Sequence, residues 1–168
     1  MTTERETQLD AMEVRIDGVD VVATRTFDAP RDLVFKAWTE CDRLAQWWGP
    51  KDWTLPVCEM DFRVGGRWFY CMAGPTGEQS CGRSTYEEIV VPERIVYRDE
   101  FAERDGSIID GMPQMRITVD FGETARRTTI TSRAQFASAK DLEAAIAMGM
   151  ESGLTETWDR LAAYVATA

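Results

Sequence analysis

Histidine is missing from this sequence, and that absence restricts its chemistry more than any other feature. It excludes serine–histidine and cysteine–histidine nucleophiles, histidine-ligated metal sites and the usual general base at neutral pH. Any catalysis must use carboxylates, tyrosine, lysine, arginine, cysteine or water instead. We therefore expect neither a metal ion nor a cofactor, and the sequence favours a binding protein over an enzyme.

Long apolar runs and a surplus of positive charge are also lacking. No stretch approaches the roughly 20 apolar residues that a membrane span needs, so membrane insertion is not expected. The first residues show no basic start followed by an apolar stretch, which predicts a cytoplasmic protein without a secretory signal. The formal net charge of -10 repels phosphate backbones and argues against nucleic acid as a partner.

Cysteine is scarce and its spacing matches no metal or redox motif. The four cysteines are Cys41, Cys58, Cys71 and Cys81, and no two of them form a C-x-x-C pair. We expect four reduced thiols that fill small apolar gaps in the core.

The 168 residues that are present suit one domain with a full core. The start of the chain is polar and aperiodic, so we expect a flexible segment over residues 1–17. A single domain is expected over residues 18–168.

The first part of that domain changes from a strand pattern to a helix pattern. Residues 19–29 alternate apolar and polar side chains, as a half-buried strand does. A helix is predicted next, with Asp28 as its cap and Pro30 in its first turn. A second short helix is predicted to begin at Asp42 and to stop at Gly49–Pro50.

Residues 54–134 carry mostly strand patterns joined by short turns, which favours an antiparallel sheet. Residues 67–73 place Trp68, Tyr70 and Met72 on one face of a strand. Residues 114–121 alternate with a period of two, so that Met115 and its alternate neighbours share a face and Arg116 lies on the other. A register shift of one residue would reverse that assignment, which leaves the direction of Arg116 open.

The chain ends in a helical pattern that Ser138 is predicted to cap. Seven apolar residues follow at steps of three or four and span an arc of about 160°; they are Leu142, Ile146, Met150, Leu154, Trp158, Leu161 and Val165. Such a wide arc suits a helix in the trough of a curved sheet, and Gly149 or Gly153 could divide it into two helices. A curved sheet around one helix can enclose an apolar space, which small-molecule sites favour.

Several segments together resemble the SRPBCC superfamily, whose helix-grip fold is shared by START domains and polyketide cyclases. The segments are FDAPRDLVFKAWTECDRLAQWWGPKDWT, DFRVGGRWFYCMAGPTG, YEEIVVPERIVY and AMGMESGLTETWDRLAAYV. They look like the branch of homologues of the activator of Hsp90 ATPase. The resemblance implies an α+β helix-grip fold: a curved antiparallel sheet wrapped around a long C-terminal helix, with two short helices after the first strand.

The resemblance also implies an apolar cavity between sheet and C-terminal helix, but no shared catalytic residue. We therefore predict binding of a hydrophobic or aromatic small molecule there. Trp48 and Trp53, near the cavity mouth, and side chains facing the helix are candidate ligand contacts; all eight are Trp48, Trp53, Trp68, Tyr70, Met72, Met115, Met150 and Trp158. Each could equally be ordinary core, since large aromatic and Met side chains also fill apolar interiors.

Two alternative functions remain open. In a cyclase or dehydratase, an inward carboxylate with a raised pKa would move protons. By strand alternation, one residue of the pair Glu87 and Glu88 and one of Asp99 and Glu100 should point inward, either free or paired with an arginine such as Arg98. In an interaction protein the partner would be an Hsp90-type chaperone, which we do not expect because the chain has no length for an added binding module. Exposed strand edges leave the choice between monomer and homodimer open.

Overall fold

The computed structural model describes residues 12–168, which form one antiparallel sheet packed against helices. The eight strands are β1 (Glu13–Asp17), β2 (Asp20–Phe27), β3 (Thr54–Met60), β4 (Arg67–Ala73), β5 (Gln79–Val90), β6 (Arg94–Ala102), β7 (Met115–Thr124) and β8 (Arg127–Phe136). Their order in the sheet is β1-β2-β8-β7-β6-β5-β4-β3. The first hairpin and the six later strands are therefore joined through β2 and β8.

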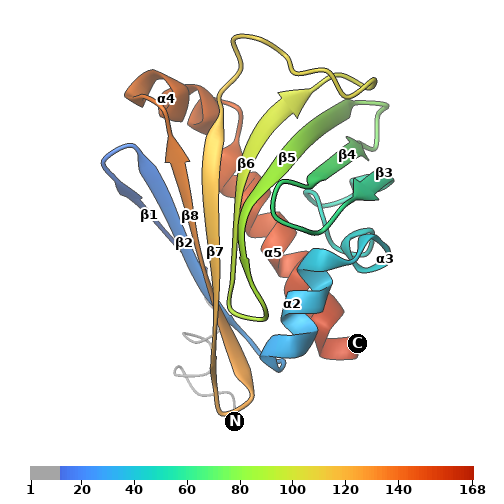
Figure 1. Cartoon of the computed structure of the whole chain (residues 1–168), viewed down its shortest axis with the longest axis vertical. Helices are drawn as coiled ribbons and strands as arrows, with labels where there is room; N and C mark the ends of the chain where they lie inside the picture. Colours follow the sequence, from blue (N-terminus) through green and yellow to red (C-terminus); the bar gives the residue numbers. More distant parts are fainter. Residues whose placement is uncertain (1–11) are drawn as a thin grey trace.

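Four helices accompany the sheet: α2 (Arg31–Thr39), α3 (Cys41–Leu44), α4 (Ala139–Ala147) and α5 (Met150–Thr167). The two short helices α2 and α3 carry the chain from β2 to the far edge strand β3, and α5 crosses the concave face of the sheet (Figure 1). This is the predicted helix-grip α+β fold.

Strand alternation places the core between the sheet and α5. On β7 the inward residues Val119 and Phe121 are buried. From α5, Trp158, Leu161 and Val165 meet them in one cluster. A salt bridge of 2.6 Å from Arg25 on β2 to Asp159 also attaches the helix to the sheet. Burial of this apolar face contributes most of the stability of the pairing, since each fully buried large side chain is worth about 1.5–3 kcal/mol.

The helical end of the chain matches its sequence pattern with one exception. Ser138 caps α4 by accepting a hydrogen bond from the Asp141 amide. The chain breaks at Gly149, whose φ of +87° favours glycine, and not at Gly153. Ile146 on α4 is exposed, whereas the six other apolar residues are buried or half-buried.

Three local expectations at the start of the chain differ from the structure. The sequence predicts a flexible segment over residues 1–17, but Glu13–Asp17 form β1, which pairs with β2; residues 1–11 lie outside the described part. Neither helix is capped as predicted, because the cap positions are occupied by Pro30 and Glu40, whose side chains make no cap hydrogen bond. At the start of α2 the Arg31 amide donates instead to Glu123 Oε2 on β7 at 2.8 Å, a partner that is distant in the sequence.

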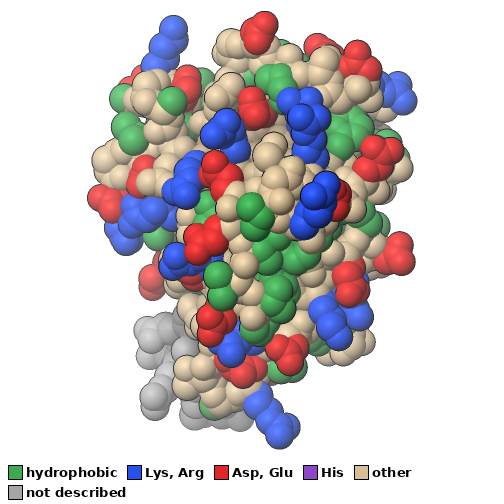
Figure 2. Space-filling model, in the orientation of Figure 1, with side chains coloured by type: hydrophobic (Ala, Val, Ile, Leu, Met, Phe, Trp, Pro, Cys, Tyr) green, Lys and Arg blue, Asp and Glu red, His purple; other side chains and the backbone are tan. Residues whose placement is uncertain are grey.

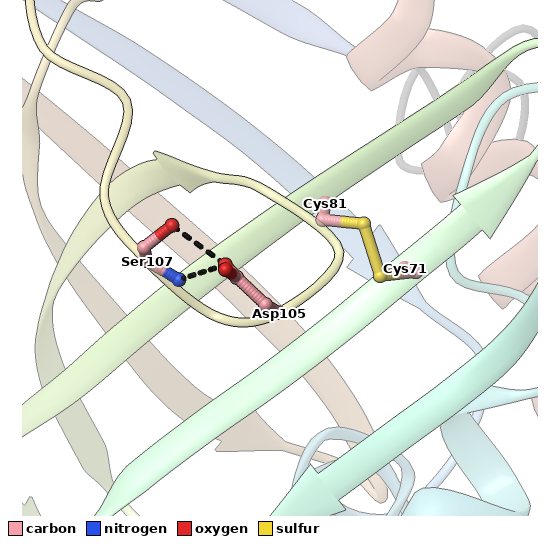
Figure 3. Close-up of a disulfide and its surroundings, with 4 residues drawn as sticks. All are labelled: Cys71, Cys81, Asp105 and Ser107. Atoms are coloured by element: carbon pink, nitrogen blue, oxygen red, sulfur yellow. Dashed lines mark hydrogen bonds between the residues drawn. A yellow bond between two sulfur atoms is a disulfide. The ribbon is translucent and has the colours of Figure 1, made fainter.

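The expectation of four reduced thiols is wrong. Cys41 is joined to Cys58, and Cys71 to Cys81. Cys71 and Cys81 are direct partners in the β4–β5 register, on the face that points away from α5 (Figure 3). The pairing depends on strand register and on the position of α3 beside β3. Neither is visible in the sequence spacing.

The outer surface carries charges of both signs. In Figure 2 acidic and basic side chains are interspersed, with apolar side chains gathered toward the lower centre of this view. The exposed apolar residues include Val64, Val90 and Val91. Within residues 12–168, none of the helices combines the length and the apolar character needed to cross a membrane.

Candidate functional site

A cavity of about 250 Å³ lies between the concave face of the sheet and the first half of α5. Its walls are almost entirely apolar. The lining residues come from β2, β4, β6, β7, β8, α2, α5 and the loop after α3: Val21, Ala23, Trp38, Trp48, Gly49, Pro50, Tyr70, Met72, Tyr97, Met115, Ile117, Ser132, Ala134, Met150, Gly153, Leu154, Thr157 and Trp158. Two of the lining positions have little or no side chain, Gly153 on α5 and Ala134 on β8.

Six of the eight candidate contact residues lie together in this lining: Trp48, Tyr70, Met72, Met115, Met150 and Trp158. Trp68 is buried behind the wall, with its ring 4.8 Å from that of Trp48. Trp53 lies against Gly74, outside the lining. The sequence pattern does not predict that these small residues line a cavity, because glycine and alanine carry no amphipathic signal of their own.

The two adjacent tryptophans have different positions. Trp47 is completely buried, and its indole N–H donates to the carbonyl of Ala37 at 3.0 Å. Trp48 is half-buried and lines the cavity, and its ring lies 5.7 Å from that of Tyr70 in an edge-to-face arrangement. Such aromatic pairs are worth about 0.5–1.5 kcal/mol beyond their buried area. Trp47 thus anchors the loop to α2, while Trp48 forms cavity wall.

Arg160 on α5 holds this loop in place. Its Nη1 donates to the carbonyls of Trp48, Gly49 and Pro50 at 3.4, 2.9 and 3.1 Å. Gly49 has a φ of +109°, and a Cβ there would lie 3.1 Å from the sulfur of Met72. Glycine is therefore needed both for the backbone conformation and for the close approach to the cavity wall.

Replacing Arg160 with methionine should loosen the loop without emptying the space that its stem fills. We expect a loss of about 1.5 kcal/mol in the free energy of unfolding, since charged hydrogen bonds to the three carbonyls disappear. Faster amide exchange at residues 48–53 should accompany it. Urea unfolding and hydrogen exchange measure the two effects, with the exposed Arg63→Met as control. Equal exchange rates in R160M and wild type would contradict this role.

A polar cluster adjoins the apolar cavity. Asp99 on β6 faces Ser84 on β5 and Met115 on β7, its direct partners in the sheet register. The hydroxyl of Ser84 donates to Asp99 Oδ1 at 3.0 Å, and the Tyr70 hydroxyl lies 3.5 Å from both carboxylate oxygens. No salt bridge to Asp99 forms among residues 12–168.

Gly82 makes room for the Tyr70 hydroxyl. It is the direct β5 partner of Tyr70, and a Cβ at this position would lie 2.5 Å from the hydroxyl oxygen. The Tyr70 ring cannot easily move aside because it is packed 4.5 Å from Trp68 and 5.7 Å from Trp48. A side chain at position 82 would therefore displace the hydroxyl from Asp99.

The other candidate carboxylates point outward. A bulge between Tyr86 and Glu88 breaks the alternation on β5, so neither glutamate of the pair faces the interior and that prediction is wrong there. Glu87 accepts from Arg116 at 2.9 Å and contacts Arg98 at 3.5 Å on the outer face. The direction of Arg116, which the sequence left open, is thus outward. For the second pair the alternation is correct, with Asp99 inward.

Burial raises the pKa of Asp99 to about 6, while the hydrogen bonds from Ser84 and Tyr70 partly oppose the shift. Desolvation, with the nearby Asp99, also raises the pKa of Tyr70 well above its ordinary value. A raised carboxyl pKa means that the folded protein binds a proton that the unfolded chain has released. This contribution to stability is complete below about pH 4 and is lost as the pH rises through about 6.

Asp99→Asn should remove that pH dependence. Between about pH 4 and about pH 7.5, the free energy of unfolding of wild type should fall by roughly 2 kcal/mol relative to D99N, after allowance for the partial exposure of the carboxyl. Urea titrations of both proteins across this range measure the difference. A difference that does not change with pH would mean that Asp99 titrates at its ordinary pKa.

The fold and this cavity can be compared with known proteins. The model of the family "Activator of Hsp90 ATPase homolog 1-like protein" matches residues 28–166. No curated protein matches. A solved structure from Staphylococcus epidermidis is 32% identical, with 93% of this chain and 94% of that chain covered and a TM-score of 0.81.

Two further solved structures are similar over nearly the whole chain. One from Arthrobacter aurescens is 29% identical, covers 93% of this chain and 92% of its own, and has a TM-score of 0.84. One from Mycobacterium smegmatis is 26% identical, with coverages of 91% and 96% and the same TM-score. Since the family model spans most of the chain, the resemblance seen in the sequence is confirmed, and the protein belongs to the activator of Hsp90 ATPase homologue 1-like family of the SRPBCC type.

Proposed function

We propose that this protein binds a small hydrophobic or aromatic molecule in the cavity between the sheet and α5. The observation that carries the proposal is the lining itself, where aromatic rings and three methionine side chains meet almost without polar groups. Binding there removes apolar ligand surface from water at about 25 cal/mol per Å². The methionines can adapt their rotamers to ligands of different outline.

The volume limits the size of the ligand. An apolar cavity of about 150 Å³ is enough for benzene, while sites for drug-sized molecules start at about 300 Å³. The cavity of about 250 Å³ lies between these two sizes. It therefore suits a molecule with one or two fused rings, or a short branched chain, rather than a sterol or a two-chain lipid.

Filling the cavity from α5 tests this function. Gly153 lines the cavity, and a Cβ there would make only an ordinary contact of 3.8 Å with Pro50. Gly153→Leu should place its side chain in the cavity and weaken binding of ethylnaphthalene at least about tenfold. The fold should remain stable, because leucine is the better helix former by about 0.8 kcal/mol.

Titration calorimetry with ethylnaphthalene measures the affinity, and thermal unfolding checks the fold. The matched control is Ala163→Leu, at an exposed position of the same helix. It should bind the probe as wild type does. The proposal is contradicted if wild type shows no saturable binding, or if G153L and A163L bind equally well.

The environment of Asp99 supports a second candidate function, proton transfer in an enzyme of the cyclase or dehydratase kind. A partly buried carboxyl with a pKa of about 6 and no arginine partner among the described residues is suited to act as a general base near neutral pH. Nitrobenzisoxazole is a suitable probe. The base removes its ring C–H proton, the electron pair forms the nitrile, and the N–O bond breaks to release a coloured phenolate.

If Asp99 can act in this way, phenolate release should rise with pH through about 6 and disappear in Asp99→Asn. Absorbance of the phenolate measures the rate, and Glu103→Gln, an exposed position, serves as control. A rate equal to that of buffer, or a rate that survives D99N, would contradict the role of Asp99 as a general base. The binding function would then remain as the proposal.

A further inference from the structure

We propose that Asp99, with Tyr70 and Ser84, forms an anchor for a hydrogen-bond donor at one end of the cavity ligand, and that the ligand is an aromatic or aliphatic molecule carrying a protonated amine. This inference rests on the proposed binding function and specifies its ligand class. It follows from where the polar cluster lies, from which of its hydrogen-bonding positions are unfilled, and from the charges around it.

The cluster lies next to the apolar cavity. A second hollow of about 170 Å³, which Asp99 lines, shares Tyr70, Met72 and Met115 with the large cavity. Tyr70 lines both spaces, and its hydroxyl points to the Asp99 carboxylate. The two methionines between the spaces are flexible, so a ligand in the large cavity can reach the carboxylate by a change of their rotamers.

The carboxylate has acceptor capacity to spare. Its two oxygens can accept about four hydrogen bonds, but they receive one good bond from Ser84, a long contact shared by both oxygens from Tyr70, and an interaction with the backbone of Glu100. The nearby arginines on β6 and β7, Arg98 and Arg116, are engaged with Glu87 on the opposite face of the sheet. A partly buried carboxylate without a cationic partner is costly, and a ligand cation would relieve that cost.

The surrounding charges select against an anionic ligand end. Glu100 is adjacent to Asp99 and also lines the second hollow, and the whole chain carries a net charge of -10. A carboxylate ligand would meet like charge in a space of low dielectric constant, which disfavours it strongly. An ammonium group instead gains a charge-assisted hydrogen bond, roughly twice as strong as one between neutral groups.

The preference should depend on pH through the carboxylate. The groups that face Asp99 are Tyr70 from β4, Ser84 from β5 and, on its own strand, Tyr97; the facing β7 residue Met115 has no charge, and the adjacent Glu100 points to the other face, where it accepts from Gln114. Both tyrosines have pKa values raised well above the ordinary value by burial, so they stay neutral across the range. The charge on which the anchor depends is that of Asp99, so the amine preference should fade as the pH drops below about 6.

Two isosteric probes test the anchor. Naphthylmethylamine and ethylnaphthalene have the same shape, and only the amine carries a charge and donors. Calorimetry at about pH 7.5 should show that wild type binds the amine at least about tenfold more tightly. Asp99→Asn should abolish this ratio but still bind ethylnaphthalene, while Glu103→Gln, which removes one exposed charge, should keep it. Naphthoate should bind most weakly to wild type.

The outcomes separate the anchor from the proposed function. If ethylnaphthalene binds but the amine has no advantage, or if D99N keeps the advantage, the anchor is wrong and the apolar binding function stands. If neither probe binds to wild type, the binding function itself fails. Ser84→Ala removes a donor to Asp99, which should raise the pKa of the carboxyl further, so the amine preference should persist but shift to higher pH; loss of the preference at every pH would also overturn the anchor.

Discussion

Trp47→Ala is expected to lower the free energy of unfolding by about 4 kcal/mol. The side chain is fully buried, and its ring lies 5.0 Å from Trp38 and 5.3 Å from Trp48. Its removal leaves a void among rings that cannot collapse onto one another. It also removes the partner of the Ala37 carbonyl, which belongs to the last turn of α2 and has no hydrogen bond within the helix.

The same change should weaken binding in the cavity, because Trp48 loses one of the rings packed against it. Urea unfolding followed by far-ultraviolet circular dichroism measures the stability without relying on tryptophan emission. Trp47→Phe should recover more than half of the loss, since it refills most of the volume but not the hydrogen bond. Trp53→Ala, at a half-buried position outside the cavity, should cost about 1 kcal/mol. Equal losses for W47A and W53A would refute the anchoring role of Trp47.

The sequence predicts the sheet well where one face of a strand is buried and the other is not. On β4, alternation correctly separates Trp68 and Tyr70, which face α5, from Cys71, which faces away. The same period of two gives the inward face of β7. Helix boundaries are predicted less well, because the cap residues of α2 and α3 make no side-chain hydrogen bond and the first amide of α2 donates to Glu123, far away in the sequence.

The polar part of the candidate site is harder to derive from the sequence. Alternation allows Asp99 to point inward after Tyr97, but it does not show that Ser84 lies opposite, because that pairing depends on the bulge between Tyr86 and Glu88. An aspartate without a cationic partner is indistinguishable in sequence from one that forms an ion pair. Gly82 is a detectable signal: a glycine within a strand pattern indicates a close approach, here that of Tyr70.

The pairing of the cysteines cannot be predicted from the sequence, for a different reason. Four cysteines allow three connectivities, and only the fold decides among them. Cys71 and Cys81 meet because β4 and β5 form a hairpin around the turn at residues 74–78, whereas Cys41 meets Cys58 because α3 lies against β3. The expectation of free thiols followed from the expectation of a cytoplasmic location, so the two disulfides weaken the argument for that location as well.

Replacing Cys41 and Cys58 together with alanine is expected to lower the free energy of unfolding by about 3 kcal/mol. The bond closes a loop over a sequence separation of 17 residues, and its loss releases that constraint in the unfolded chain. The bond also ties α3, which precedes the Trp47–Trp48 loop, to the edge strand β3. Cavity binding should therefore weaken together with stability. Replacing Cys71 and Cys81 together with alanine should lower the free energy of unfolding slightly less, because that bond spans only 10 residues.

Thiol counting under denaturing conditions checks the bonds directly. Protein purified without reductant should expose no reactive thiol until it is reduced, and four afterwards. Reductant should lower the stability of wild type further than that of either double variant, because each variant keeps one bond to lose. Alkylation inside living cells before lysis then relates the bonds to location: blocked thiols would place the protein in a reducing compartment, and protected cysteines would place it where disulfides persist. Four reactive thiols in the purified, unreduced protein would show that the cysteines merely lie side by side and would remove the stability loss predicted here.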